Sequence, residues 1–204
     1  MEVFRLLDLF GRIPDFEAFL ITYERYNEQM WEAYRNGKIK KDFMRKERMN
    51  LTFLEMGIND SLLVEKANEL YVHTAPKMSN LFDDVHEVLD YLKTRYRLYI
   101  LTNGFTEIQV QKIRNSGLQN YFTKLFMAEM AGYQKPDKRF FEYAVKSIHA
   151  HKKDCLMIGD DVGADIRGAM NAGIDQVFFN RQKKKTDVVP TYEINSIKEL
   201  RDIL

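Results

Sequence analysis

The stretch Cys155-Leu156-Met157-Ile158-Gly159-Asp160-Asp161 decides the fold that the sequence predicts. Four apolar residues run without a break into a glycine and two acids, a pattern typical of a strand that is buried on both faces of a parallel sheet and then turns. The acids then stand at the carboxyl end of the strand, where open α/β sheets bind their ligands. We therefore expect a buried strand at 155–158 and a ligand site beside it.

The acidic turn after this strand predicts a cation site. Asp160, Asp161 and Asp165 fall within six residues and supply the hard oxygen ligands that Mg²⁺ prefers. Gly159 and Gly168 keep the backbone small, so that a ligand or a neighbouring segment can approach closely. The alternative is an acidic, solvated turn in which one aspartate caps the helix that follows.

Bulk properties limit the class of protein. A chain of 204 residues with 45% hydrophobic content can bury a substantial core, as one domain or as one domain with a smaller insertion. Its formal net charge of +1 argues against nucleic acid as a partner. The sequence has no signal peptide pattern and no apolar run long enough for a membrane span, so we expect a cytoplasmic protein that contacts no membrane. It defines no oligomeric state. The single cysteine, Cys155, excludes an internal disulfide and is expected to be a small buried hydrophobe.

Residues 1–75 contain no convincing strand and predict a bundle of helices. Pro14-Asp15 opens a long helix with an apolar stripe from Phe16 to Tyr34, which we interpret as bundle core. Trp31 and the tyrosines of this stripe offer an alternative, a face that contacts a ligand. Two further helices are expected at 40–56 and 62–73, the second capped by Asp60 or Ser61.

Beyond Pro76 the pattern alternates between helices and strands. Helices are expected at 83–95, 106–115, 138–147 and 164–172 and strands at 97–101, 124–128, 155–158 and 176–180, with Ser196 and Glu199 forming a capping box for a last helix. Such alternation predicts an α/β fold, a doubly wound parallel sheet built by right-handed crossovers. The chain is therefore expected to divide into a helical part, 1–75, and a Rossmann-like part, 76–204.

Two more polar segments follow strands of this predicted sheet. Thr102-Asn103-Gly104 brings a hydroxyl, an amide and a glycine to a helix N-terminus, which can bind an anion such as phosphate. Lys135 adds an ammonium group on a loop held by Pro136. Each segment alone also suits an ordinary turn or an exposed lysine. Together with the acidic turn, in this order at successive strand ends, they indicate one site.

The segments Ile100–Gly104, Lys135–Asp137 and Gly159–Asp165 resemble the second, third and fourth motifs of the haloacid dehalogenase superfamily of aspartate-nucleophile phosphatases. The residues before Pro76 resemble the helical cap that this family inserts after its first strand. The run Thr102–Thr106 and the tail Pro190–Tyr192 are similar to a subgroup that hydrolyses pyrimidine nucleoside 5′-monophosphates.

This resemblance implies roles for individual residues. The hydroxyl group of Thr102 and the amide that follows it at Asn103 would bind the transferring phosphoryl group, with Gly104 in the same phosphate-binding turn. Lys135 would neutralise the charge of this group and that of the nucleophile. Asp160 would bind Mg²⁺ directly or through water. Asp165 would support it, and Asp161 would contribute less.

The family's first motif, Asp-x-Asp on an N-terminal strand, has no counterpart before residue 20, where Asp8 and Asp15 stand in other patterns. We expect that the first residue here is an internal methionine of a longer, active protein; a true truncation that has lost catalysis is the alternative. The absent strand would lie between the strand that ends at Thr102 and the one that ends at Asp160, and these would have unpaired edges. Loss of one oxyanion-hole donor lowers the turnover rate by a factor on the order of a hundred to a thousand, whereas loss of the nucleophile lowers it on the order of a millionfold. The missing motif therefore outweighs the motifs that are present.

Two classes of function follow. The first is a Mg²⁺-dependent phosphomonoesterase for a small phosphorylated metabolite, such as a nucleoside monophosphate, working through an aspartyl-phosphate. The second is a non-catalytic binding or interaction protein that keeps a phosphate and metal pocket. A dehalogenase and a phosphomutase are further alternatives on the same fold, and the fold alone does not choose among them. The acidic turn counts against a dehalogenase, because a dehalogenase needs no Mg²⁺.

Overall fold

The computed structural model describes residues 5–7, 9–13 and 15–204. Contacts divide the chain into two compact units, Met1–Met78 and Ser79–Leu204, which we call the helical unit and the α/β unit. The division falls just beyond Pro76, where the sequence pattern changes from helices alone to alternating helices and strands.

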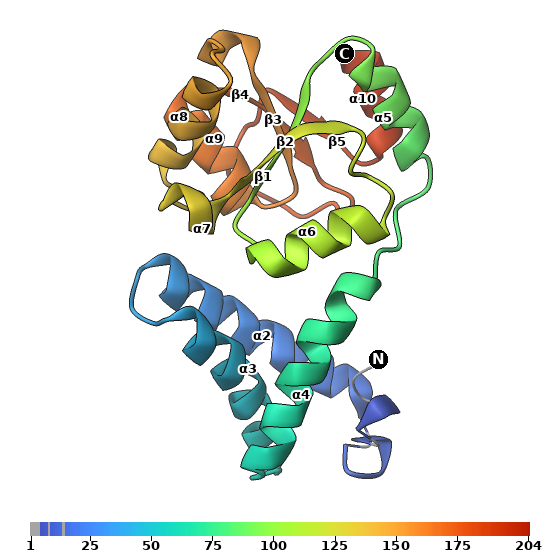
Figure 1. Cartoon of the computed structure of the whole chain (residues 1–204), viewed down its shortest axis with the longest axis vertical. Coiled ribbons are helices and arrows are strands. Elements are labelled where there is room, and N and C mark those ends of the chain that lie inside the picture. The colour runs from blue at the N-terminus through green and yellow to red at the C-terminus, as the bar shows by residue number, and fades with distance from the viewer. Residues whose placement is uncertain (1–4, 8, 14) are drawn as a thin grey trace. The chain divides into compact units, whose positions relative to one another are not determined.

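Three long helices form the helical unit: α2, Phe16–Arg35; α3, Lys41–Glu55; and α4, Ser61–Thr74 (Figure 1). Single 3₁₀ turns accompany them at Leu9–Gly11 and Ala75–Lys77. The cap predicted at Asp60 is confirmed, since its side chain accepts the N–H of Leu63. Asp15, which was expected to open α2, caps that helix by accepting the N–H of Ala18. Asp8 and Pro14, which the sequence analysis discusses, lie outside the described residues.

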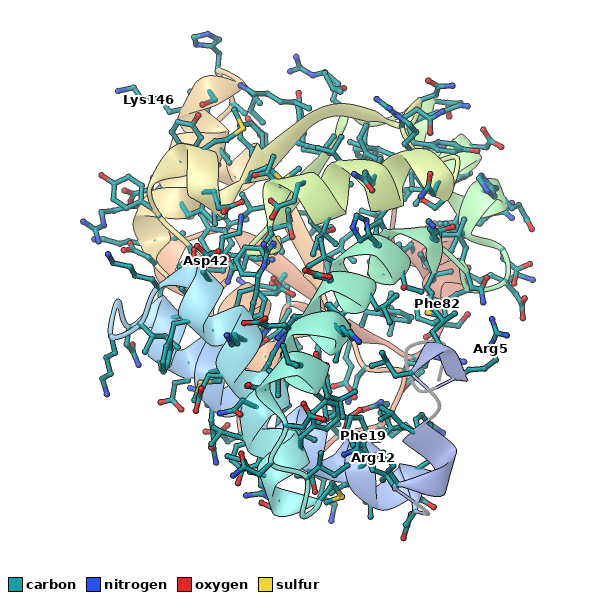
Figure 2. All side chains as sticks on the ribbon, turned by 60° about the horizontal axis from the view of Figure 1, so that its bottom comes forward. Arg5, Arg12, Phe19, Asp42, Phe82 and Lys146 are labelled. Carbon is teal, nitrogen blue, oxygen red and sulfur yellow. The ribbon has the colours of Figure 1, made fainter. Side chains whose placement is uncertain are left out.

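The core of the helical unit is apolar and is supplied by all three helices and the turns beside them. Phe19, labelled in Figure 2, lies in this core with its ring centroid 5.9 Å from that of Phe53. The predicted stripe on α2 is only partly core, because Tyr23 and Trp31 are half-buried and Leu20 is exposed.

All strands of the α/β unit run parallel, but they form two separate sheets. β1, Leu98–Thr102, pairs with β2, Phe122–Met127. β3, Leu156–Gly159, pairs with β4, Asp175–Phe179, which in turn pairs with β5, Tyr192–Ile194. The four predicted strands are present within a few residues of their expected limits. β5 was not predicted, because three residues after a polar loop carry too little periodicity to indicate a strand.

Helices cover both sides of these strands. α5, Val85–Lys93, and α10, Leu200–Ile203, pack on one side, whereas α8, Lys138–Ser147, and α9, Gly168–Ala172, pack on the other (Figure 1). Lys146, near the end of α8, points into solvent (Figure 2). The predicted capping box is present, and it opens the 3₁₀ turn Ile197–Glu199 that leads into α10.

The remaining helical segments lie in the connections. They are α6, Thr106–Asn115; α7, Ala128–Ala131; a 3₁₀ turn, Lys152–Asp154; and a π-helical turn, Val162–Arg167. Two predictions are corrected here. The strand expected at 124–128 ends one residue earlier, because α7 begins at Ala128, and the single helix expected at 164–172 is a π-helical turn followed by α9.

β1 pairs only with β2 and β3 only with β4 among the described strands, so each keeps one unpaired edge. A cavity of about 740 Å³ is lined by residues 98–101 of β1 and by residues 155–158 at β3. Consecutive side chains point to opposite faces of a strand, so a cavity on one face would contact only every second residue. This cavity contacts four consecutive residues of each segment, and it therefore runs along the unpaired backbone edges. We call this cavity the groove.

The open edge explains a prediction that is wrong. β3 was expected to be buried on both faces, yet Ile158 is 38% exposed and Cys155 is only half-buried. Both residues line the groove, where no described strand covers them.

Candidate active site

A buried ion pair joins two of the predicted motifs in the α/β unit. Nζ of Lys135 lies 2.5 Å from Oδ1 of Asp165 and donates a second hydrogen bond of 2.8 Å to the carbonyl oxygen of Leu101 on β1. Lys135 is 8% exposed and Asp165 is 5% exposed. The ammonium group therefore stands at the carboxyl end of β1 and is held there by the turn that follows β3.

Asn103 fixes the backbone on which Lys135 stands. Its side-chain Oδ1 accepts the N–H of Lys135, and its Nδ2 donates to the carbonyl oxygen of the same residue, both at 2.8 Å. This amide was predicted to contact phosphate, whereas in the structure both of its polar atoms bind the loop of the third motif. The positioning role links residues 32 positions apart, so no local pattern could have revealed it.

Thr102 and Gly104 form the turn between β1 and α6. The hydroxyl oxygen of Thr102 accepts the N–H of Gly104 at 3.0 Å, and α6 begins two residues later at Thr106. Thr102 and Gly104 thus form the ordinary turn that the sequence allowed as the alternative to an anion site. It also brings the Thr102 hydroxyl to the same strand end as the ammonium group of Lys135.

The three aspartates of the acidic turn have different surroundings. Asp161 caps the π-helical turn by accepting the N–H of Ala164 at 2.7 Å. One aspartate of the turn therefore has the capping role that the sequence offered as the alternative to a cation site. Asp165 is buried, and its Oδ2 accepts the N–H of Asp161 at 3.3 Å. Asp160 is exposed, directly follows β3, and has no hydrogen bond or ion pair with a described residue.

Burial controls the protonation of the Asp165 carboxyl. Desolvation raises its pKa above the ordinary value, and the charge and hydrogen bond of Lys135 act in the opposite direction. The pair is therefore an electrostatic unit in which each charge depends on the other, and removal of either partner would leave an uncompensated buried charge.

Two glycines allow this close arrangement. A Cβ atom at Gly159 would lie 2.3 Å from Oδ2 of Asp165, and one at Gly168 would lie 2.7 Å from the ring of Phe141 and 3.0 Å from Cα of Pro136. The close approach predicted for these two positions is thus needed by the protein's own packing: Gly159 admits the carboxylate, and Gly168 admits the loop that carries Lys135.

The donors around the acidic turn suit a hard cation only in part. Asp160 and Asp165 provide carboxylate oxygens of the type that Mg²⁺ prefers, and Mg²⁺ often takes one or two carboxylates while keeping several waters. Within the described residues no group of three or more histidine, cysteine, aspartate or glutamate side chains is arranged to hold a metal. The residues present therefore fit a weakly held, largely hydrated ion better than a closed metal site.

Comparison with known proteins identifies the family. The model of the haloacid dehalogenase-like hydrolases matches residues 16–179, which includes the three motifs described above. The chain belongs to this family. Membership agrees with the α/β fold that the sequence predicted, a Rossmann-like core with a helical cap.

Several relatives in the family match nearly the whole chain. A HAD-hydrolase of Bacillus subtilis, YfnB, is 32% identical over 98% of this chain and 86% of its own length. The pyrimidine 5′-nucleotidase PynA of Streptococcus pneumoniae is 34% identical over 94% of this chain and 82% of its own. The crystal structure of YfnB bound to magnesium superimposes with a TM-score of 0.87, covering 98% of this chain and 88% of that one.

No helix among the described residues is long and apolar enough to cross a membrane. Hydrogen bonds link Thr102, Asn103, Gly104, Lys135 and Asp165 at one end of the α/β unit. Asp160 lies beside them in the chain. The sequence motifs indicated these residues, and the close approach that was predicted at Gly159 and Gly168 is what lets them meet.

Proposed function

We propose that this protein is a Mg²⁺-dependent phosphomonoesterase for a small phosphorylated metabolite, with pyrimidine nucleoside 5′-monophosphates as the first substrates to test. The observation that carries the proposal is the buried Lys135–Asp165 pair, held by Asn103 at the carboxyl ends of β1 and β3. Family membership supports hydrolysis, and the nucleotidase named among the relatives supports the substrate class.

The phosphoryl group would be bound by cationic and hydrogen-bonding groups at the end of β1. The ammonium group of Lys135 and the hydroxyl group of Thr102, together with backbone N–H groups of the turn at Asn103 and Gly104, are suited to the equatorial oxygens, which gain charge in the transition state. Asn103 would act mainly by fixing Lys135, because its side chain is already engaged.

Asp160 and Asp165 are the residues that would hold Mg²⁺. When bound, the ion would neutralise charge on the phosphoryl oxygens. The exposed side chain of Asp160 is free to bind it, since it makes no hydrogen bond or ion pair with a described residue, and Asp165 would do so while paired with Lys135.

The nucleophile is proposed to be an aspartate on a further strand that occupies the groove. Such a strand would satisfy the free edges of β1 and β3 and end beside Lys135. Its carboxylate would attack phosphorus, the ester P–O bond would break, and the leaving alkoxide would take a proton from a carboxylic acid. Water would then cleave the aspartyl-phosphate, which releases phosphate and restores the carboxylate.

The experiment uses the 204-residue chain with an apolar strand of about five residues, ending in Asp-x-Asp, joined before Met1 by a flexible linker. We call this the strand-extended chain. Phosphate release from uridine 5′-monophosphate is measured with Mg²⁺ for this chain and for its Lys135→Ala and Asp160→Asn variants. We expect turnover that both substitutions reduce by a factor on the order of a hundred or more. Lys198→Ala, which removes a surface ion pair with Asp84, is the control and should change little.

A second candidate is a binding protein without catalysis. The open groove favours it, because no described strand brings a nucleophilic carboxylate to Lys135. In that case phosphate or a nucleotide raises the melting temperature of the 204-residue chain while phosphate esters stay intact. Substantial activity in both the Lys135→Ala and Asp160→Asn variants would argue against the phosphatase. A melting temperature that neither phosphate nor a nucleotide changes would argue against the binding protein.

A further inference from the structure

Arg48 on α3 is a buried cation in the helical unit. It is 4% exposed and makes no ion pair with any residue that the structure describes. Six other arginines among the described residues each reach a carboxylate at the surface: Arg12, Arg25, Arg35, Arg139, Arg167 and Arg201. A buried guanidinium without a counter-charge is costly, so its retention calls for a compensating partner.

The surroundings of Arg48 compensate its charge only in part. Nη1 donates to Oδ1 of Asn27 at 2.7 Å, and the guanidinium carbon lies 4.8 Å from the ring centroid of Tyr71 and 5.7 Å from that of Tyr23. The two rings attract the positive charge but leave its remaining N–H groups without acceptors. All three helices of the unit, α2, α3 and α4, thus converge on this one side chain.

Several hydrogen-bond donors remain unused at this point. Nε of Arg48 and the hydroxyl group of Tyr23 are buried without a partner. Nη2 of Arg48 also makes no hydrogen bond with a described residue, and it keeps some contact with solvent. Burial raises the pKa of the Tyr23 phenol, the nearby Arg48 charge lowers it, and the neighbouring Tyr71 phenol raises it further, so the hydroxyl group stays protonated and can donate.

These unused donors are of the type that binds an anion. Nε and Nη2 form one edge of the guanidinium, and such an edge binds the two oxygens of a carboxylate or phosphate in parallel. The Tyr23 hydroxyl supplies a further donor, and the solvent contact at Nη2 gives a direction of approach. A neutral water could accept these hydrogen bonds, but it would leave the charge uncompensated.

We propose that Arg48, with Tyr23 and Tyr71 around it, is a binding site for the oxyanion of a small ligand, a carboxylate or a phosphoryl group. The site lies wholly within the helical unit. It goes beyond the proposed hydrolysis, and its existence depends on neither the metal nor the groove.

The test follows the Nε–H resonance of Arg48 in ¹H–¹⁵N spectra of the 204-residue chain, assigned by its loss in Arg48→Lys. Inorganic phosphate, acetate and chloride are titrated at constant ionic strength. We expect a saturable shift with phosphate, with acetate or with both, and none with chloride. A response to phosphate alone identifies a phosphoryl ligand, and a response to acetate alone identifies a carboxylate.

Variants separate binding from packing. Tyr23→Phe should weaken binding about fivefold, the effect of one net hydrogen bond, while the Arg48 resonance stays observable. Arg25→Lys is the matched control, because Arg25 is exposed and already bound to Glu55, and it should leave the titration unchanged. If neither phosphate nor acetate shifts the Arg48 resonance, or if Tyr23→Phe binds as tightly as the wild type, the proposal is overturned and a buried water completes the cluster. Phosphate release plays no part in this readout, so failure here is distinct from failure of the proposed function.

Discussion

Replacement of Asn103 by alanine would test how the site is held together. The substitution removes both hydrogen bonds between the Asn103 amide and the backbone of Lys135, each 2.8 Å long and partly buried. A net hydrogen bond contributes about 1 kcal/mol, so we predict a local loss of about 2 kcal/mol, or about a 30-fold change in the opening equilibrium of the loop.

Amide hydrogen exchange measures this opening directly, because the N–H of Lys135 is the group that loses its acceptor. In Asn103→Ala the Lys135 amide should exchange about 30-fold faster, while the amides of β4 keep their protection. Asn68→Ala is the control: it also removes an asparagine side-chain hydrogen bond, to the carbonyl oxygen of Val64, but in the helical unit. Equal exchange at Lys135 in the wild type and in Asn103→Ala would refute the positioning role.

Two further predictions concern stability. Gly159→Ala should cost about 1–3 kcal/mol and lower the melting temperature, because the new Cβ would lie 2.3 Å from Oδ2 of Asp165; Gly163→Ala, whose Cβ would lie 3.4 Å from its nearest neighbour, should change the melt little, and equal effects would contradict the clash. Hydrogen bonds from Arg25 hold the pKa of the Glu55 carboxyl below its usual value in the folded state, so their stabilisation is present above the unfolded pKa and is lost as pH falls through the folded one. The melting temperature should therefore fall less steeply with decreasing pH in Glu55→Gln than in the wild type. Equal slopes for the two proteins would show that the Arg25–Glu55 pair does not contribute in this way.

Local chemistry made much of the fold predictable. The caps at Asp15, Asp60 and Ser196 depend on contacts within three residues, so the sequence indicates them directly. The alternation of helices and strands after Pro76 likewise appears in the spacing of apolar residues. Family resemblance then assigned Lys135 to the site, although a lysine before proline is by itself unremarkable.

Features that depend on distant contacts were not predictable. The positioning role of Asn103 arises from a loop 32 residues away, and the exposure of Ile158 arises from the free edge of β3. The buried charge of Arg48 depends on three helices meeting, whereas its sequence neighbours suggest an ordinary surface position on α3. In each case tertiary contacts override the local pattern.

The central claim is that the α/β unit is a phosphatase site completed by a strand in the groove. The most direct measurement is the rate of phosphate release from uridine 5′-monophosphate by the strand-extended chain, compared with the 204-residue chain and with a strand-extended chain whose Asp-x-Asp is Asn-x-Asn. We predict that only the aspartate strand gives turnover, by a factor that approaches a millionfold. If amide exchange shows the edges of β1 and β3 protected by the strand, yet phosphate release equals that of the asparagine version, the claim is wrong.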